Sequence, residues 1–406
     1  MSRASEPLRR RLGTTDAVVV GLGSMIGAGV FVVFAPAAAA AGSSLLLGLA
    51  VAALVAYCNA TSSARLAAQY PLSGGAYVYG RERLGDFWGY LAGWSFIVGK
   101  TASCAAMALT AGVYLWPAQA NAVAVSAVVA ITAVNYRGIE KSARLTRGIV
   151  AVVLAVLAGV VAVVFTSGRV EIARVSPAGG TVTGVLQAAG LLFFAFAGYA
   201  RIATLGEEVR DPARTLPRAI GLALGITLAV YATVAVAVLA VLGPEQLAGA
   251  AAPLAEAVKS AGAGGLEPAV RVGAAAAALG ALLSLILGVS RTILAMARDG
   301  NLPTGLAAVH PRFGVPHRAE LTVGAVVAVL VAVVDIRGAI GFSSLTVLVY
   351  YAIANAAAWT LGRRAIPAAG FAGCLLLAGF LPLGSVLTGF AVLALGAGIY
   401  AIGRSR

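Results

Sequence analysis

The sequence predicts an all-α integral membrane protein with about twelve transmembrane helices. Hydrophobic residues make up 60% of the 406-residue chain and charged residues only 11%, whereas soluble domains carry about 25% charged residues. The apolar runs are continuous and lack the period-two alternation of membrane-spanning strands, so they indicate helices rather than an outer-membrane barrel. Only short polar segments separate them, and we therefore expect no soluble domain beside the membrane part.

The apolar runs are long enough to cross about 30 Å of hydrocarbon. The polar, basic residues 1–13 are expected to form a cytoplasmic tail. No small-residue cleavage site follows the first run, so we expect it to be a retained helix and not a signal peptide. Residues 243–268 are too interrupted to span, and we expect a short helix over the outer face there. The predicted helices begin near residues 15, 44, 86, 119, 146, 182, 217, 270, 320, 340, 366 and 384.

The net charge of +14 is explained by membrane topology. If the N-terminus is cytoplasmic and successive helices alternate in direction, the loops hold 21 arginines and lysines on the cytoplasmic side and 5 on the outer side. This excess predicts a multi-pass protein of the cytoplasmic membrane with both termini in the cytoplasm. Because the charges are spread over short loops, the sequence argues against a nucleic-acid partner.

The residues that bind metals or perform catalysis are few and scattered. Cys58, Cys104 and Cys374 lie far apart in apolar runs, and the two histidines, His310 and His317, share one loop. These spacings fit neither a metal site nor a disulfide framework. No nucleophile–base pair or phosphate-binding loop lies within the membrane part. The sequence therefore predicts no enzyme, no cofactor and no metal.

Two of the predicted helices are interrupted by glycine. The segment GLGSMIGAGVF (21–31) has four glycines, each costing a helix interior about 1 kcal/mol relative to alanine. The segment LLFFAFAGYARIATLGEEVRDP (191–212) has one glycine flanked by aromatic residues. Breaks in the first and sixth helices match an inverted-repeat transporter with its substrate at the breaks. This spacing predicts five-helix repeats over 14–168 and 181–364, followed by two additional helices over 365–402.

Four segments, in this order, resemble amino acid permeases of the amino acid–polyamine–organocation (APC) superfamily. They are GSMIGAGVF (23–31), QYPLSGGAYVYGRERLGDFWGYLAGW (69–94), FFAFAGY with GEEVRDPARTLPRAI (193–220), and SRTILAMARDGNLP (290–303). The resemblance covers roughly residues 14–320. It implies a LeuT-like fold of inverted five-helix repeats with two extra helices. It also implies secondary transport of amino acids, as a symporter or an antiporter.

The resemblance also implies where the substrate binds. Its carboxylate would meet the backbone of the first break, Ile26–Gly29, where free N–H groups carry partial positive charge and glycine permits close approach. Alternatively, these glycines only permit close helix packing. The ammonium would meet carbonyls of the second break, with Phe194 closing over the substrate unless that ring serves packing. The predicted substrate-binding residues are Met25, Ile26, Gly27, Ala28, Gly29, Lys100, Cys104, Phe194, Ala195, Phe196, Ala197, Gly198 and Leu285.

Lys100 lies about fifteen residues into the third helix, near the bilayer centre, where a charge costs several kcal/mol. In related permeases this part of the third helix lines the cavity. Many sodium-independent relatives carry a lysine in the fifth helix, where this chain has a neutral residue near Val153. We hypothesise that Lys100 takes over this role, reaching toward the first break as a proton carrier or a fixed charge. A structural lysine that caps carbonyls of the first helix is the alternative.

Other charges near the membrane fall at the inner ends of helices. Arg201 and Arg291 are interpreted as gate or interface residues that pair with Glu207, Glu208 or Asp299. In the resembling permeases the loop that holds Glu207 and Glu208 belongs to the gate. The predicted coupling and gating residues are Lys100, Arg201, Glu207, Glu208 and Arg291.

All fifteen acidic residues are expected in loops or at helix ends. A cationic substrate would need a buried carboxylate, so neutral amino acids are favoured. Transport is expected to be sodium-independent, with protons as possible partners or with exchange. The alternatives are a carrier of the same fold for an organic amine, a nucleobase or an inorganic ion, and a membrane enzyme or channel. Besides the substrate and the lipid bilayer the sequence indicates no partner, and it leaves the oligomeric state open.

Overall fold

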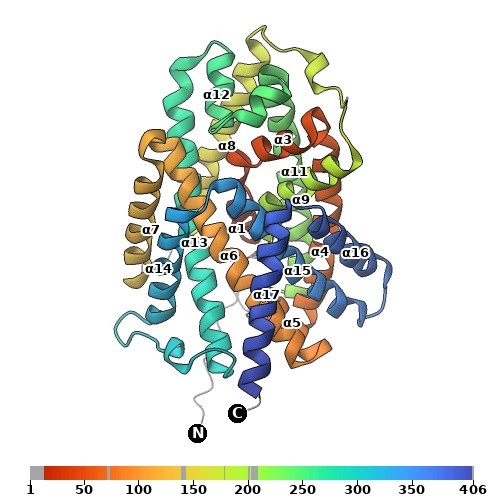
Figure 1. Cartoon of the computed structure of the whole chain (residues 1–406), viewed down its shortest axis with the longest axis vertical. Helices are drawn as coiled ribbons and strands as arrows, with labels where there is room; N and C mark the ends of the chain where they lie inside the picture. The colour runs from red at the N-terminus through yellow and green to blue at the C-terminus, as the bar shows by residue number, and fades with distance from the viewer. Residues whose placement is uncertain are drawn as a thin grey trace.

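The computed structural model is a bundle of helices (Figure 1). It describes residues 13–70, 74–138, 143–177, 179–199, 202 and 209–404. These residues form helices and connecting loops, with no β-strand. Ten helical segments among them are long and apolar enough to cross a membrane, and Ala365–Gly379 is a shorter apolar helix.

The first half of the chain follows the predicted order. The first membrane helix is divided into three pieces, and a short helix separates the second and third membrane helices. The helices are α1 (Thr14–Met25), α2 (Gly29–Val32), α3 (Phe34–Ala41), α4 (Leu45–Gln69), α5 (Ala76–Leu84), α6 (Asp86–Leu115), α7 (Ala120–Tyr136) and α8 (Ala143–Thr166), with 3₁₀ turns η1 (Gly42–Ser44) and η2 (Pro117–Gln119).

In the second half, one long helix, α11, is kinked at Gly243, which has a φ of 74° and is followed by Pro244. The helices are α9 (Val182–Phe196), α11 (Pro212–Gly249), α12 (Pro253–Ser260), α13 (Glu267–Arg298), α14 (His317–Val333), α15 (Ile336–Trp359), α16 (Ala365–Gly379) and α17 (Leu383–Arg404), with 3₁₀ turns η3 (Ile172–Val175), η4 (Ala197–Tyr199), η5 (Gly264–Leu266) and η6 (Thr304–Ala307).

The helices begin within a few residues of the predicted positions, because continuous apolar runs set their placement. The short helix expected within 243–268 is α12, which lies at the upper end of the molecule in Figure 1. Two predicted spans, α14 with 17 residues and α16 with 15, are not among the ten segments long and apolar enough to cross a membrane. The predicted tail, residues 1–13, lies outside the described residues except for Gly13.

The centre of the bundle is formed by α6 and α15, which are the most buried of the long helices, whereas α7 and α17 lie at its outside. Small residues allow the central pair to approach closely. A Cβ atom at Gly99 of α6 would lie within overlapping distance of the Thr346 Oγ1 atom on α15. The side chains of α6 are therefore held in a fixed orientation by the surrounding helices.

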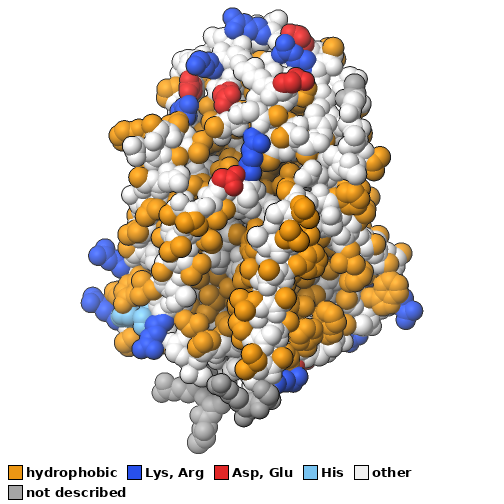
Figure 2. Space-filling view, viewed as in Figure 1, with side chains coloured by type: hydrophobic (Ala, Val, Ile, Leu, Met, Phe, Trp, Pro, Cys, Tyr) orange, Lys and Arg blue, Asp and Glu red, His pale blue; other side chains and the backbone are white. Residues whose placement is uncertain are grey.

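The surface carries an apolar belt between two charged ends (Figure 2). The end at α12 is called the upper end below, and the end at α5 and Arg404 the lower end. Exposed leucine, valine and phenylalanine side chains on α7, α8, α14 and α17 form part of the belt. A soluble protein would not expose so large an apolar surface, so the chain is a multi-pass membrane protein.

Candidate substrate site

The first membrane helix is broken at its middle, as predicted. Helix α1 ends at Met25, residues 26–28 are not helical, and α2 begins at Gly29. Within the described residues the N–H groups of Gly27 and Ala28 donate no hydrogen bond to a backbone carbonyl. Both residues are buried. The break therefore leaves polar backbone inside the bundle, away from water.

The sixth membrane helix changes its backbone at the same depth. Helix α9 ends at Phe196 and continues as the 3₁₀ turn η4. The two breaks lie against each other at Gly198: a Cβ atom there would be 2.7 Å from the Met25 nitrogen and closer still to the Ser24 carbonyl. Only glycine permits this distance between the two backbones.

Side chains from other helices bond the carbonyls at both breaks. The Tyr231 hydroxyl of α11 lies 2.5 Å from the Met25 carbonyl oxygen and 3.1 Å from that of Ala195. Its single proton can be donated to either carbonyl. The Tyr351 hydroxyl of α15 lies 3.4 Å from the Ala197 carbonyl oxygen. These buried tyrosines offset part of the cost of breaking a helix away from water.

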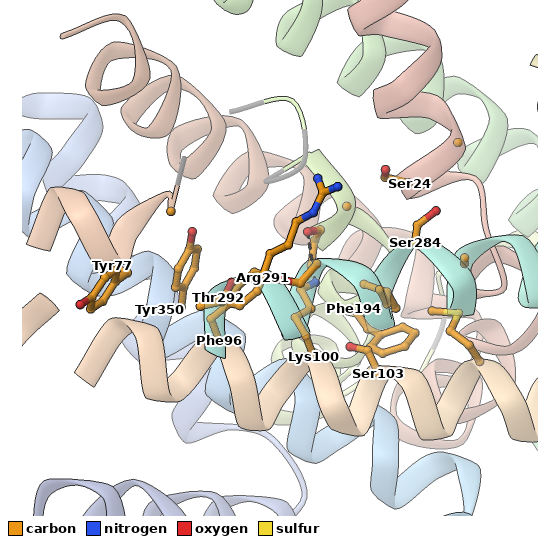
Figure 3. A pocket seen from close by; sticks show the side chains of 18 of the residues that line it. Ser24, Tyr77, Phe96, Lys100, Ser103, Phe194, Ser284, Arg291, Thr292 and Tyr350 are labelled. Carbon is orange, nitrogen blue, oxygen red and sulfur yellow. Dashed lines mark hydrogen bonds between the residues drawn. The ribbon is translucent and has the colours of Figure 1, made fainter. Parts of the chain in front are cut away.

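A cavity of about 210 Å³ adjoins the breaks. It extends from the second break, past α6 and α13, to α5 at the lower end. Figure 3 shows the side chains of Lys100, Phe194 and Arg291 around the same space. The rest of the cavity wall is mainly apolar and aromatic, with a few hydroxyl groups. The hydroxyl groups belong to Ser24, Ser103, Ser284 and Thr292, and the other lining side chains include Tyr77, Phe96, Met107, Leu285 and Tyr350.

Lys100 projects from the centre of α6 into this cavity and is only 7% exposed. Its Nζ atom donates a hydrogen bond of 3.3 Å to the Ala197 carbonyl, at the second break. The sequence interpretation placed this lysine toward the first break, and the hydrogen bond in the structure runs to the other one. The difference arises because α6 presents Lys100 to the η4 turn, a tertiary arrangement that spacing along one helix does not reveal.

Comparison with known proteins agrees with this architecture. A model of the family described as amino acid permease matches residues 12–405. The chain belongs to the amino acid permease family. An uncharacterized transporter of Mycobacterium tuberculosis is 71% identical over 98% of this chain and 92% of its own length.

More distant relatives of this permease are named after the amino acids that they transport. A branched-chain amino acid permease of Bacillus subtilis is 29% identical over 81% of the chain and 76% of its own length. A chloroplastic cationic amino acid transporter of Arabidopsis thaliana is 29% identical over 87% of the chain and 66% of its own length. The chain is thus a transporter and not an enzyme, and its relatives differ in the charge of the amino acids after which they are named.

The predicted site residues of the permease divide into three groups. Lys100, Phe194, Ala197, Gly198, Leu285 and Arg291 line the cavity. The second group is buried behind the wall: Met25, Ile26, Gly27, Ala28, Gly29, Cys104, Ala195 and Phe196. Arg201, Glu207 and Glu208 lie outside the described residues.

The second group shows what the first break does in this structure. A Cβ atom at Gly29 would lie 2.9 Å from that of Ala195, and one at Gly27 would lie 3.1 Å from that of Ala281. Both glycines therefore permit close helix packing, which was the alternative interpretation of this motif. Because residues 26–29 are buried, their N–H groups would reach a substrate carboxylate only after the surrounding helices separate.

Several lining residues escaped the sequence analysis, although helical periodicity points to them. One face of α6 carries Lys100 and three further lining residues at helical spacing. They are Phe96, four residues before the lysine, Ser103, three after it, and Met107, seven after it. Cys104 was predicted instead of Ser103, because both are one turn from the lysine. The Ser103 hydroxyl lies 2.6 Å from that of Ser343 on α15, which holds this face of α6 against α15.

The expectation that no carboxylate is buried needs correction. Glu320 lies in the first turn of α14 and is fully buried. Its position at a helix end agrees with the prediction. Its burial does not, and it arises because α14 packs against α6, α7 and α13, which cover this end of the helix. Arg291, which lines the cavity, is the charged group that acts electrostatically on it. A carboxyl group therefore lies near the arginine of the cavity wall.

At the lower end of the cavity, Tyr77 of α5 is part of a hydrogen-bond network. Its hydroxyl donates to Asp299 Oδ2 at 2.5 Å and accepts from Asn301 Nδ2 at 3.0 Å. Arg81 bonds the same Asp299 oxygen at 2.7 Å. Burial, together with the bond to Asp299, raises the pKa of Tyr77 to about 12, so the hydroxyl remains a donor at neutral pH.

Among the described residues, no group of three or more histidine, cysteine or acidic side chains is arranged to hold a metal ion. The chemistry that the cavity walls offer is ionic and hydrogen-bonding contact with a small solute. These are the contacts that binding and release of an unchanged substrate require.

Proposed function

We propose that this permease is a secondary active transporter that moves neutral amino acids across the cytoplasmic membrane by alternating access. The observation that supports this proposal most is the position of Lys100, in the wall of a cavity that adjoins two broken helices. Substrate sites of inverted-repeat transporters lie at such breaks. We assign residues 14–168 and 181–364 to the two repeats and 365–402 to two additional helices.

The substrate would bind between the two breaks. Its carboxylate would meet the N–H groups at Ile26–Gly29 once the helices that bury them separate, and Phe194 would close over its side chain. The carbonyls at the second break already have donors, because Tyr231 reaches that of Ala195 and Lys100 reaches that of Ala197. A substrate ammonium would therefore have to share or displace these donors, which couples substrate binding to the position of Lys100.

Selection of neutral over cationic substrates follows from the same lysine. Two unit charges about 6 Å apart at an effective dielectric constant of about 20 repel by about 2.8 kcal/mol, which weakens binding about a hundredfold. A cationic side chain near Lys100 would meet this repulsion. The buried carboxyl group of Glu320 does not line the cavity, and Arg291, which does, is the charged group that acts electrostatically on it.

Transport is proposed to be sodium-independent, driven by protons or by exchange. A sodium site in this cavity would depend on hydroxyls such as Ser284 and on backbone carbonyls, and Lys100 would oppose it. Both termini and the lower end are proposed to face the cytoplasm, as the positive-inside rule indicates. The gate at that end would comprise Arg201, Glu207, Glu208 and Arg291.

A thermal-shift screen of the purified protein against the twenty amino acids tests the proposal. A ligand at one hundred times its dissociation constant stabilises a protein by about 2.7 kcal/mol. We expect small or branched neutral amino acids to raise the melting temperature, and arginine and lysine to leave it unchanged. Stabilisation by arginine alone would refute the substrate class, and stabilisation by none of the twenty would count against amino acid transport.

A further inference from the structure

A second hollow lies on the outside of the bundle, as a groove of about 630 Å³ between α7 and α14. Small apolar side chains, among them Ala133, Ala325 and Ala328, form its walls. Gly324 forms part of its floor, since a Cβ atom there would lie 2.5 Å from the Thr132 Oγ1 atom. The groove lies in the apolar belt and faces the hydrocarbon, so its upper part suits a flexible acyl chain.

Arginine side chains surround the lower end of this groove. Arg137, at the end of α7, lines it. Arg318 is exposed on α14, one turn before the first lining residue of that helix. Its guanidinium donates a hydrogen bond of 3.5 Å to the Gly305 carbonyl. The Arg312 guanidinium lies 5.4 Å from the Phe313 ring, which packs 6.2 Å from that of Tyr136. In Figure 2 basic and histidine side chains gather at the foot of α7 and α14, with no acidic side chain visible beside them.

We propose that the groove binds one molecule of an anionic phospholipid. Its acyl chain lies along the alanine walls, and its phosphate lies between Arg137 and Arg318. The apolar wall and the paired arginines follow one another in the order of the acyl chain and the phosphate of such a lipid. Guanidinium groups bind phosphate through paired hydrogen bonds, and basic pockets between membrane helices bind anionic head groups.

The head group decides which lipid is bound. A zwitterionic lipid such as phosphatidylethanolamine presents an ammonium beside its phosphate, and the arginines at the groove repel it. Phosphatidylglycerol has no such cation. The binding site therefore selects phosphatidylglycerol over phosphatidylethanolamine.

Native mass spectrometry of the full-length protein, titrated with each lipid in turn, tests this proposal. We expect one molecule of phosphatidylglycerol to be retained under conditions that remove phosphatidylethanolamine. Each arginine near an anionic lipid changes the affinity about fivefold, so the double variant Arg137→Gln and Arg318→Gln should bind about 25-fold more weakly. Arg364→Gln, an exposed arginine at the foot of α16, is the matched control and should bind as the wild type does.

A second variant tests the groove rather than its charge. Ala325→Phe fills it from an exposed position on α14, whereas Ala394→Phe adds the same ring to an exposed position on α17. We expect loss of the retained lipid only in the first, with an unchanged melting temperature showing that both variants fold.

Three results would overturn the proposal. The first is equal retention of phosphatidylglycerol and phosphatidylethanolamine by the wild type. The second is retention unaffected by the arginine pair or by Ala325→Phe. The third is a dimer that Ala325→Phe dissociates, since this would show that a second copy of the chain covers the groove.

Discussion

The contact between the two broken helices makes a sharp prediction for Gly198→Ala. The added Cβ would lie 2.7 Å from the Met25 nitrogen and within overlapping distance of the Ser24 carbonyl. All of these are backbone atoms, which no side-chain rotation can move away. Overpacking of this kind costs about 1–3 kcal/mol, and relief would come only from separating the two breaks.

Gly225→Ala on α11 is the matched control. It adds the same methyl group at a position where nothing lies within 4 Å of the added Cβ. Replacing a helix glycine by alanine gains up to about 1 kcal/mol. Thermal unfolding of the purified variants and uptake in proteoliposomes measure the two effects. We expect Gly198→Ala to lower both the melting temperature and uptake, and Gly225→Ala to lower neither. A Gly198→Ala protein with wild-type stability and uptake would refute the contact.

Three further predictions concern the cavity and its surroundings. Tyr231→Phe keeps the ring but removes the donor near the Met25 and Ala195 carbonyls, so the melting temperature should fall by the equivalent of about 1–3 kcal/mol; no change would mean that water or another group replaces the hydroxyl. Gly288→Val places a side chain in the cavity, where nothing lies within 4 Å of the added Cβ. It should preserve the stability of the protein but abolish the rise in melting temperature caused by substrate. An unaltered rise would mean that the substrate binds elsewhere. In competition assays arginine and lysine should inhibit uptake at least tenfold more weakly than leucine, whereas potent inhibition by arginine would show that Lys100 does not exclude cations.

The path of the chain was predictable because apolar runs and glycine positions determine it. The start of α6 at Asp86 and that of α9 at Val182 agree with the predicted starts, and the first helix breaks beside Gly27. In a membrane protein these features are local: a continuous apolar run must form a helix, and a glycine-rich run weakens it.

The cavity itself was less predictable, because its walls come from helices far apart in the sequence. Tyr231 and Tyr351 look like ordinary aromatic residues of membrane helices, and only the packing of α11 and α15 brings their hydroxyls to the breaks. Lys100 was identifiable by its depth, but the carbonyl that it contacts was not. Glu320 has the sequence position of a loop-end acid, and its burial depends on the three helices that cover it.

We propose that the charge of Lys100 replaces a sodium ion and couples transport to protons. Uptake of a neutral amino acid into proteoliposomes, measured with and without sodium and with and without a pH gradient, tests this role directly. We predict that the wild type needs no sodium and accumulates substrate in response to the pH gradient. Lys100→Met should lose this accumulation while retaining some exchange. A wild-type protein that requires sodium, or a Lys100→Met protein that accumulates substrate as the wild type does, would contradict this role of Lys100.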